Sequence, residues 1–193
     1  MAVVTALHER PRGIVEVCLD GAPWRLVPAD AIVRAGLTVG RTLDRDAART
    51  LARELRRSRA LAVAARALRH RDLSRSRLEE RLAQRGARAD VRADALAALE
   101  RAGLVDDERV AAARAAGLAD RGFGNEAIRE TLEREGLGPE AVEQALDGLV
   151  PEPERARALV ERRGESAATL RWLAAKGFDH GVLEDLAGFA DGT

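Results

Sequence analysis

The chain has 193 residues with a formal net charge of zero, and 46% of its residues are apolar. This length and composition suffice for one or two compact domains with a buried core. Cys18 is the single cysteine, which excludes a disulfide within the chain and favours a reducing compartment. The longest run without a charged residue, Met1 to His8, is far shorter than a membrane span, and Glu9 interrupts any secretory signal. We therefore expect a cytoplasmic protein with no membrane segment.

The charge is neutral in total but unevenly distributed along the chain. It is +1 over residues 1–50, +6 over 51–100, −5 over 101–150 and −2 over 151–193. Residues 53–92 alone contain 13 arginines and five acidic residues. This asymmetry indicates either a polyanionic partner or two regions of one molecule that attract each other.

The beginning of the chain, from Met1 to Val27, has the composition of β-strands. The pair Asp20-Gly21 separates two apolar runs and predicts the turn of a β-hairpin. Alternation between residues 15 and 19 puts three side chains on one face and two on the other: Val15, Val17 and Leu19 against Glu16 and Cys18. We therefore expect Cys18 to be a half-buried filler and not a nucleophile.

Helices are predicted from Asp44 almost to the end, because Ala, Leu, Arg and Glu recur there with a period of three to four residues. Before that point, Pro28, Gly36 and Gly40 interrupt any long element. Further breaks fall at Gly86, Gly103, Gly122 with Gly124, Gly136 with Gly138 and Pro139, Pro151 with Pro153, Gly164 and Gly177. We expect each of these glycines at a helix C-terminus, where a left-handed residue is needed.

Three of these breaks form an internal repeat. The sequences are Leu82-Ala-Gln-Arg-Gly86, Leu132-Glu-Arg-Glu-Gly136 and Leu173-Ala-Ala-Lys-Gly177. Their glycines recur at two intervals of similar length, and each interval fits a unit of three short helices repeated in tandem. The first helices of the three units are predicted at Ala60 to His70, Asp107 to Arg121 and Glu154 to Arg163.

The predicted fold class is mainly α, with tandem three-helix repeats in an elongated curved array and a small strand-containing N-terminal segment. The predicted divisions are 1–44 for the strand segment with its short hairpin, 45–105 for a basic first repeat, 106–150 for an acidic second repeat and 151–193 for a third. N-caps support these boundaries, since Ser74 and either Asp106 or Asp107 precede predicted helices.

In this order and spacing, several segments resemble the RecX family of bacterial recombinase regulators. They are the capped helix Ser74 to Gly86, the segment Gly103-Leu-Val-Asp-Asp-Glu-Arg-Val-Ala111, the segment Arg121-Gly-Phe-Gly124, the helix with Ile128 and Leu132 that leads into Gly136-Leu137, and the pair Ala145-Leu146. The resemblance is clear over residues 60–150 and poor over residues 1–44. This chain has Val110 where the family usually has a large aromatic residue.

The resemblance implies a curved array of three-helix repeats that lies along the groove of the RecA filament. There it would hinder filament growth or promote disassembly, restrain ATP hydrolysis and strand exchange, and so regulate DNA repair, recombination and the SOS response. The family is commonly basic whereas this chain is neutral, so at most weak binding to single- or double-stranded DNA is expected. We expect a monomer.

The candidate contact residues for a recombinase or for phosphates are arginines. Arg77, Arg81 and Arg85 recur at i, i+4 and i+8 along one helical face, where like charges repel slightly unless an anion lies against them. The full candidate set is Arg66, Arg69, Arg71, Arg75, Arg77, Arg81, Arg85, Arg121, Arg129 and Arg134. The alternatives are a solvated or intramolecularly paired face for the first stripe, and i,i+4 pairing with Glu126, Glu130 and Glu133 for the last three arginines.

The sequence offers little for catalysis. Three scattered histidines, one cysteine and no phosphate-binding loop predict a protein that is not an enzyme and needs no cofactor or metal. Asp106, Asp107 and Glu108 are expected to cap a helix, and Phe123 and Trp172 to belong to the core instead of stacking on bases. The alternative function is a stand-alone nucleic-acid-binding helical module that acts through the Arg-rich first repeat.

Overall fold

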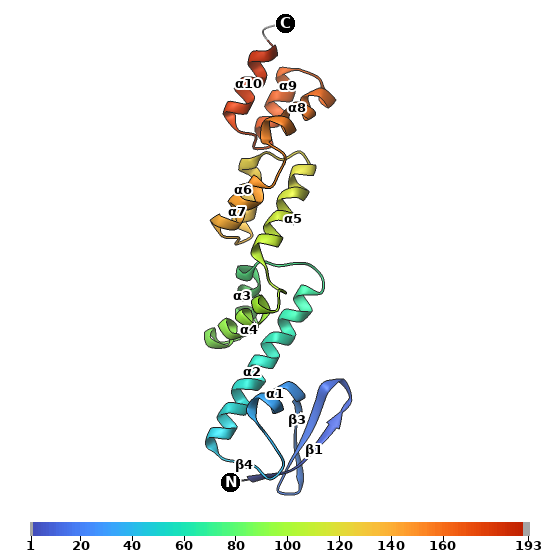
Figure 1. Cartoon of the computed structure of the whole chain (residues 1–193), viewed down its shortest axis with the longest axis vertical. Helices are drawn as coiled ribbons and strands as arrows, with labels where there is room; N and C mark the ends of the chain where they lie inside the picture. The colour runs from blue at the N-terminus through green and yellow to red at the C-terminus, as the bar shows by residue number, and fades with distance from the viewer. Residues whose placement is uncertain (1, 191–193) are drawn as a thin grey trace. The chain divides into compact units, whose positions relative to one another are not determined.

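Figure 1 shows the computed structural model of the chain, which describes residues 2–190. The described part contains ten α-helices and four β-strands, so the protein is mainly helical with a small N-terminal strand segment, as predicted. It divides into two compact units. Unit 1 comprises Met1–Arg71 and Glu79–Ala102, and unit 2 comprises Asp72–Leu78 and Gly103–Thr193.

Unit 1 begins with a four-stranded antiparallel sheet in the order β3-β2-β1-β4. The strands are β1 (Ala2–Arg10), β2 (Ile14–Leu19), β3 (Ala22–Pro28) and β4 (Thr42–Leu43). The predicted hairpin is confirmed, because Asp20 and Gly21 connect β2 to β3 with φ angles of 49° and 85°. Two positive φ angles in a two-residue loop match the right-handed twist of the flanking strands.

One face of this sheet builds the core of unit 1. Val15 and Val17 are buried there with Val4 and Val27, as the alternation predicted. Cys18 was expected to be half-buried, but only 7% of it is exposed. The reason is its place on a central strand, where Ala6 and Pro23 on the neighbouring strands flank it.

Helices α1 (Ala29–Ala35) and α2 (Arg45–Leu68) cover the core face of the sheet. The short α1 was not predicted, since the breaks at residues 28–44 concealed it. Helical structure from Asp44 onward is confirmed, since Asp44 caps α2 by accepting a hydrogen bond of 2.7 Å from the Ala47 N–H. The first helix of the first repeat was predicted only from Ala60 to His70, but α2 is one continuous helix that includes the residues before Ala60. Leu51 and Leu55 of this earlier part pack into the sheet core.

The other helices begin and end close to the predicted breaks. They are α3 (Arg75–Gln84), α4 (Ala89–Arg101), α5 (Asp107–Asp120), α6 (Asn125–Arg134), α7 (Pro139–Asp147), α8 (Glu152–Arg163), α9 (Ala167–Ala175) and α10 (His180–Ala190). Positive φ angles occur, as expected, at Gly86, Gly103, Gly122, Gly136, Gly164 and Gly177. The expectation was wrong for Gly124 and Gly138, which have extended backbone and are the N-caps of α6 and α7.

Unit 2 contains two groups of three packed helices (Figure 1). Helices α5, α6 and α7 enclose a core that includes Val110, Ile128, Leu132 and Val142, while α8, α9 and α10 enclose a second core around Leu173. The predicted caps are present, since Ser74 Oγ accepts from the Arg77 N–H at 3.3 Å and Asp106 Oδ1 from the Arg109 N–H at 2.9 Å. Within residues 2–190, no helix is both long and apolar enough to span a bilayer.

Candidate functional site

Two adjoining hollows in unit 1 are lined by α2 together with α3 and the turn that leads into α4. The first has a volume of about 270 Å³ and is lined by Arg56, Arg59, Ala60, Val63, Leu82, Arg85, Gly86, Ala87, Arg88 and Val91. The second, of about 490 Å³, is lined by Ala62, Val63, Arg66, Ala67, His70, Arg81 and Arg85. Because the two share Val63 and Arg85, we treat them as one surface, the basic hollow.

The basic hollow has only one sign of charge in its lining. Six arginines carry this charge, His70 also lines the hollow, and no aspartate or glutamate does. Five of the arginines form no ion pair with any residue in the described part of the chain: Arg56, Arg59, Arg66, Arg81 and Arg85. The sixth, Arg88, has its Nε 3.3 Å from Asp90 Oδ1 in an exposed pair. The surface therefore presents unneutralised guanidinium groups to an external anion.

Helical periodicity explains how the sequence builds this surface. On α2 the lining residues recur every three or four positions from Arg56 to Arg66. On α3, Arg81 and Arg85 are separated by one turn, and Gly86 then ends the helix with φ of 76°. Their floor is apolar, because Val63 and the fully buried Leu82 lie between the arginines.

A guanidinium group suits this position chemically. It stays protonated, and its fixed set of N–H donors matches the two oxygens of a carboxylate or a phosphate. Exposed like charges on one helix cost a few tenths of a kcal/mol per neighbouring pair, which a bound anion offsets. The basic hollow is therefore suited to bind an anionic surface.

The ten arginines predicted as contact residues do not all lie in this hollow. Arg66, Arg81 and Arg85 line it, whereas Arg69 and Arg71 are exposed at the end of α2 and in the loop after it. Arg75 is the first residue of α3, and its backbone N–H donates a 2.7 Å hydrogen bond to Asp107 Oδ1.

The remaining predicted arginines belong to unit 2 and mostly have partners there. Arg77 Nη2 donates to the Arg134 carbonyl at 2.5 Å. Arg129 makes a bidentate pair with Glu143, and Arg134 pairs with Glu130 at i,i+4 with an N···O distance of 2.7 Å. Arg121 is exposed directly after α5. The structure thus brings three of the ten together.

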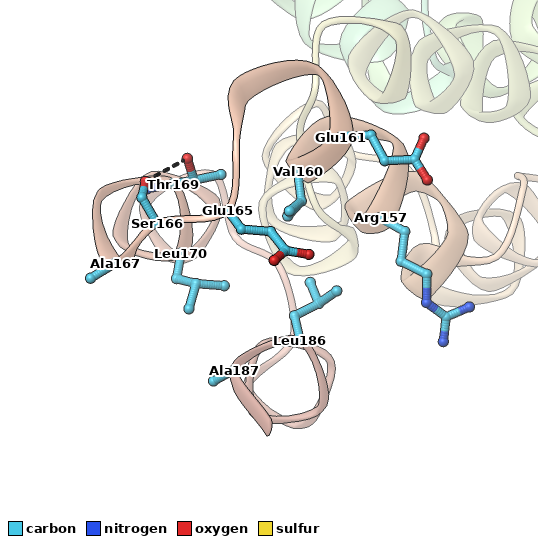
Figure 2. A pocket seen from close by; sticks show the side chains of 10 residues that line it. All are labelled: Arg157, Val160, Glu161, Glu165, Ser166, Ala167, Thr169, Leu170, Leu186 and Ala187. Atoms are coloured by element: carbon cyan, nitrogen blue, oxygen red, sulfur yellow. Dashed lines mark hydrogen bonds between the residues drawn. The ribbon is translucent and has the colours of Figure 1, made fainter. Parts of the chain in front are cut away.

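A third hollow lies among the last three helices (Figure 2). It has a volume of about 610 Å³ and is lined by Arg157, Val160, Glu161, Glu165, Ser166, Ala167, Thr169, Leu170, Leu186 and Ala187. Figure 2 shows Val160, Leu170, Leu186 and Glu165 pointing toward its centre, while Arg157 and Glu161 lie at the rim. We call it the C-terminal hollow.

Comparison with known proteins identifies the fold. No protein-family model matches the sequence, and a search of curated proteins found no match. A crystal structure of regulatory protein RecX superposes with a TM-score of 0.83 at 21% identity, covering 97% of this chain and all of that one. The chain has the RecX fold. The crystal structure of RecX from Lactobacillus salivarius matches with a TM-score of 0.61 at 19% identity, covering 70% of this chain and 97% of that one.

The RecX resemblance predicted from the sequence is thus confirmed at the level of the fold. Val110, which replaces the aromatic residue typical of the RecX family, is buried among α5, α6 and α7. Phe123 and Trp172 pack against the cores of unit 2, as expected. Their faces are contacted by cations, since Lys176 Nζ lies 3.9 Å from the Phe123 ring centroid and Arg163 Cζ 4.2 Å from that of Trp172.

Sequence analysis missed three arginines and one histidine of the basic hollow in this RecX-like chain. They are Arg56, Arg59, Arg88 and His70. The signal was present on α2, where Arg56, Arg59 and Arg66 share a face with small residues. It was missed because the first helix of the first repeat was placed at Ala60 to His70, which separates Arg56 and Arg59 from Arg66. Arg88 carries no such signal, since it enters the surface only through the turn after Gly86.

Proposed function

We propose that the chain is a regulatory protein that binds a RecA-type recombinase filament and restrains its growth, ATP hydrolysis and strand exchange. It would thereby regulate DNA repair and recombination, without catalysis of its own. The observation that carries this proposal is the likeness, over 97% of the chain, to a crystal structure of regulatory protein RecX.

The basic hollow is the proposed contact surface. Arg56, Arg59, Arg66, Arg81 and Arg85 would pair with phosphates of the filament DNA or with carboxylates of the recombinase. Since the surrounding lining contains no acidic side chain, these arginines keep their full attraction for the partner. The arginines outside the hollow that already hold carbonyls or carboxylates are assigned a structural role.

The proposed working form is a tandem array of three-helix repeats. Residues 45–105, 106–150 and 151–193 form the repeats, and residues 1–44 form an additional strand segment. Packing of α5 with α6 and α7, and of α8 with α9 and α10, supports the last two divisions. An array of this kind offers an extended binding surface, as repeat proteins commonly do.

The test is the DNA-stimulated ATPase of the cognate recombinase on single-stranded DNA. The chain is titrated far below the concentrations of recombinase and of DNA sites, so that coating of the DNA cannot explain inhibition. We expect hydrolysis to fall clearly at these ratios. Unchanged hydrolysis at every ratio, with a folded chain, would contradict the proposal.

A stand-alone nucleic-acid-binding module is the second candidate, and the single-sign lining of the basic hollow favours it. In that case the chain binds DNA without the recombinase, and the logarithm of its affinity falls with the logarithm of salt concentration by about 0.7 per phosphate contact on single strands. Binding that requires the recombinase and depends weakly on salt would exclude this candidate.

A further inference from the structure

Helices α3, α6 and α9 are joined by two end-to-end contacts within unit 2. The last turn of α6 lies against the start of α3. Ser74 Oγ donates a 2.7 Å hydrogen bond to the Glu135 carbonyl, and Arg77 Nη2 donates to the Arg134 carbonyl. The contact is close, because a Cβ on Gly136 would lie 2.7 Å from Ser76 Oγ.

The same arrangement recurs one group further along. The last turn of α9 lies against the start of α6, where the Gly124 N–H donates to the Lys176 carbonyl at 2.9 Å and the Glu126 N–H to the Gly177 carbonyl at 3.1 Å. A Cβ on Gly177 would lie only 2.6 Å from Ala127 Cβ. In both places, donors at one helix start satisfy carbonyls that the other helix leaves without intrahelical partners.

A third glycine has the same local geometry but no such neighbour. Gly86, Gly136 and Gly177 have φ angles of 76°, 77° and 78°, and each follows its helix with the same pair of capping hydrogen bonds. Around Gly86, however, a Cβ would meet no atom of the described residues within 4 Å. The end of α3 is therefore an exposed counterpart of the two ends that are covered.

The start of α9 is exposed, whereas the starts of α3 and α6 are each covered by the end of another helix. Ser166 caps α9 by accepting a 3.1 Å hydrogen bond from the Thr169 N–H, as Ser74 caps α3. Ser166 and Ala167 are exposed and line the C-terminal hollow, toward whose centre Val160, Leu170, Leu186 and the carboxylate of Glu165 point (Figure 2). The starts of α3 and α6 are covered by Gly136 and Gly177, whereas this start faces the hollow.

We propose that the Gly86 end of one copy of this chain docks in the C-terminal hollow of a second copy. The docked end would repeat the junction that Gly136 and Gly177 already make within the chain. The central charges are complementary, because Arg85, which has no acidic partner among the described residues, flanks the docking end and Glu165 points toward the centre of the hollow. Arg88 at the docking end is paired with Asp90, and Glu161 lies at the rim of the hollow.

The rim of the hollow also carries one cation. Arg157 lies there beside Glu161, and Figure 2 shows both side chains directed away from the centre. The contact joins different surfaces of the two copies, so it is head-to-tail and each new copy exposes a further hollow. Self-association at high concentration would replace the monomer expected from the sequence, and this inference does not depend on the proposed function.

Sedimentation velocity of the full chain tests the proposal without any recombinase. The chain is measured from about 1 µM to about 1 mM, a range that covers weak association. At low ionic strength we expect the average mass to rise with concentration above the 20.8 kDa of one chain. At about 1 M salt, where the Debye length is about 3 Å, we expect the rise to be largely lost.

Two charge-reversal variants make the test specific. The first double variant combines Arg85→Glu and Arg88→Glu, and the second combines Glu161→Arg and Glu165→Arg. Each is expected to stay monomeric alone, because like charges then meet at the junction. An equimolar mixture of the two restores opposite charges and is expected to assemble like the wild type. Two matched controls change exposed residues that line neither the docking end nor the hollow, and both are expected to assemble normally. They are the double variants Arg34→Glu/Arg45→Glu and Glu140→Arg/Asp147→Arg.

Three results would overturn the proposal. They are a wild-type mass that stays at one chain throughout, reversal variants that assemble alone as the wild type does, and a mixture that remains monomeric although both variants are folded by circular dichroism. Assembly seen only after removal of residues 188–193 would assign the hollow to those residues and would equally overturn the proposal for the full chain.

Discussion

Several arginines of unit 2 and those of the basic hollow in unit 1 have different surroundings. In unit 2, Arg129 pairs with Glu143, Arg134 with Glu130 and Arg114 with Glu135. In the basic hollow, five of six arginines have no acidic partner among the described residues. In a chain with 31 arginines, the number of arginines therefore says little about binding, whereas their local partners distinguish paired arginines from those that the proposal assigns to binding.

Arg155 is the clearest structural arginine. Its guanidinium donates to the Val150 carbonyl at 2.9 Å, to the Phe123 carbonyl at 2.8 Å and to Asn125 Oδ1. Burial lowers the pKa of Arg155, and the nearby charge of Glu152 partly opposes that shift. Arg155 thus joins the start of α8 to the turn before α6.

The largest expected effect is the loss of this guanidinium. We expect Arg155→Ala to lower the free energy of unfolding of unit 2 by about 3 kcal/mol. The variant removes a charged donor and leaves the three oxygens that accept its hydrogen bonds without a donor. Urea unfolding in a Trp24→Phe background measures this, since Trp172 then reports unit 2 alone.

The control for this change is its exposed neighbour Arg157. We expect Arg157→Ala to alter the free energy of unfolding by no more than about 0.5 kcal/mol. Equal losses for the two variants would show that arginine partners do not separate the two roles.

The next effect compares a covered helix end with an exposed one. Alanine at Gly177 or Gly86 costs about 1–2 kcal/mol from the left-handed backbone alone. Gly177→Ala adds a clash with Ala127, so we expect it to cost roughly 2 kcal/mol more than Gly86→Ala. Urea unfolding reports Gly177→Ala through Trp172 and Gly86→Ala through Trp24. Similar costs would contradict the tight junction between α9 and α6.

The smallest expected effects on stability compare an exposed paired arginine, Arg129, with an exposed arginine of the basic hollow, Arg66. We expect Arg129→Ala to cost about 0.5 kcal/mol, since it removes an exposed bidentate pair with Glu143. Arg66→Ala should leave the free energy of unfolding unchanged within about 0.5 kcal/mol, because the side chain is exposed and has no acidic partner in the described part. A clear loss for Arg66→Ala would assign this arginine to the structure.

Much of the fold could be predicted from local signals. The turn at Asp20-Gly21, the caps Ser74 and Asp106 and the left-handed Gly136 each have a local physical cause, and the structure contains all of them. Helix α1 was missed, because packing on the sheet stabilises it more than its sequence pattern indicates. Helical structure from Asp44 was predicted, but not that it continues without a break through Ala60.

The candidate site was less predictable. Arg81 and Arg85 follow from helical spacing, but their joining with Arg56 and Arg59 depends on how α3 and α4 pack on α2. Equally, nothing in the spacing of Arg129 shows that Glu143, which lies on the following helix α7, would neutralise it. Contacts between helices decide which arginines remain unpaired, and these contacts are not visible in one helix alone.

The most direct test of the account is the affinity of the chain for the recombinase filament assembled on single-stranded DNA. Two double variants are compared. The hollow variant combines Arg66→Glu and Arg81→Glu and reverses two charges inside the basic hollow, whereas the control combines Arg34→Glu and Arg45→Glu and makes the same charge change outside it. The hollow variant is expected to bind at least about tenfold more weakly than the wild type, a loss of about 1.4 kcal/mol, while the control keeps its affinity. Equal affinities of the two folded variants would contradict the assignment of the basic hollow as the contact surface.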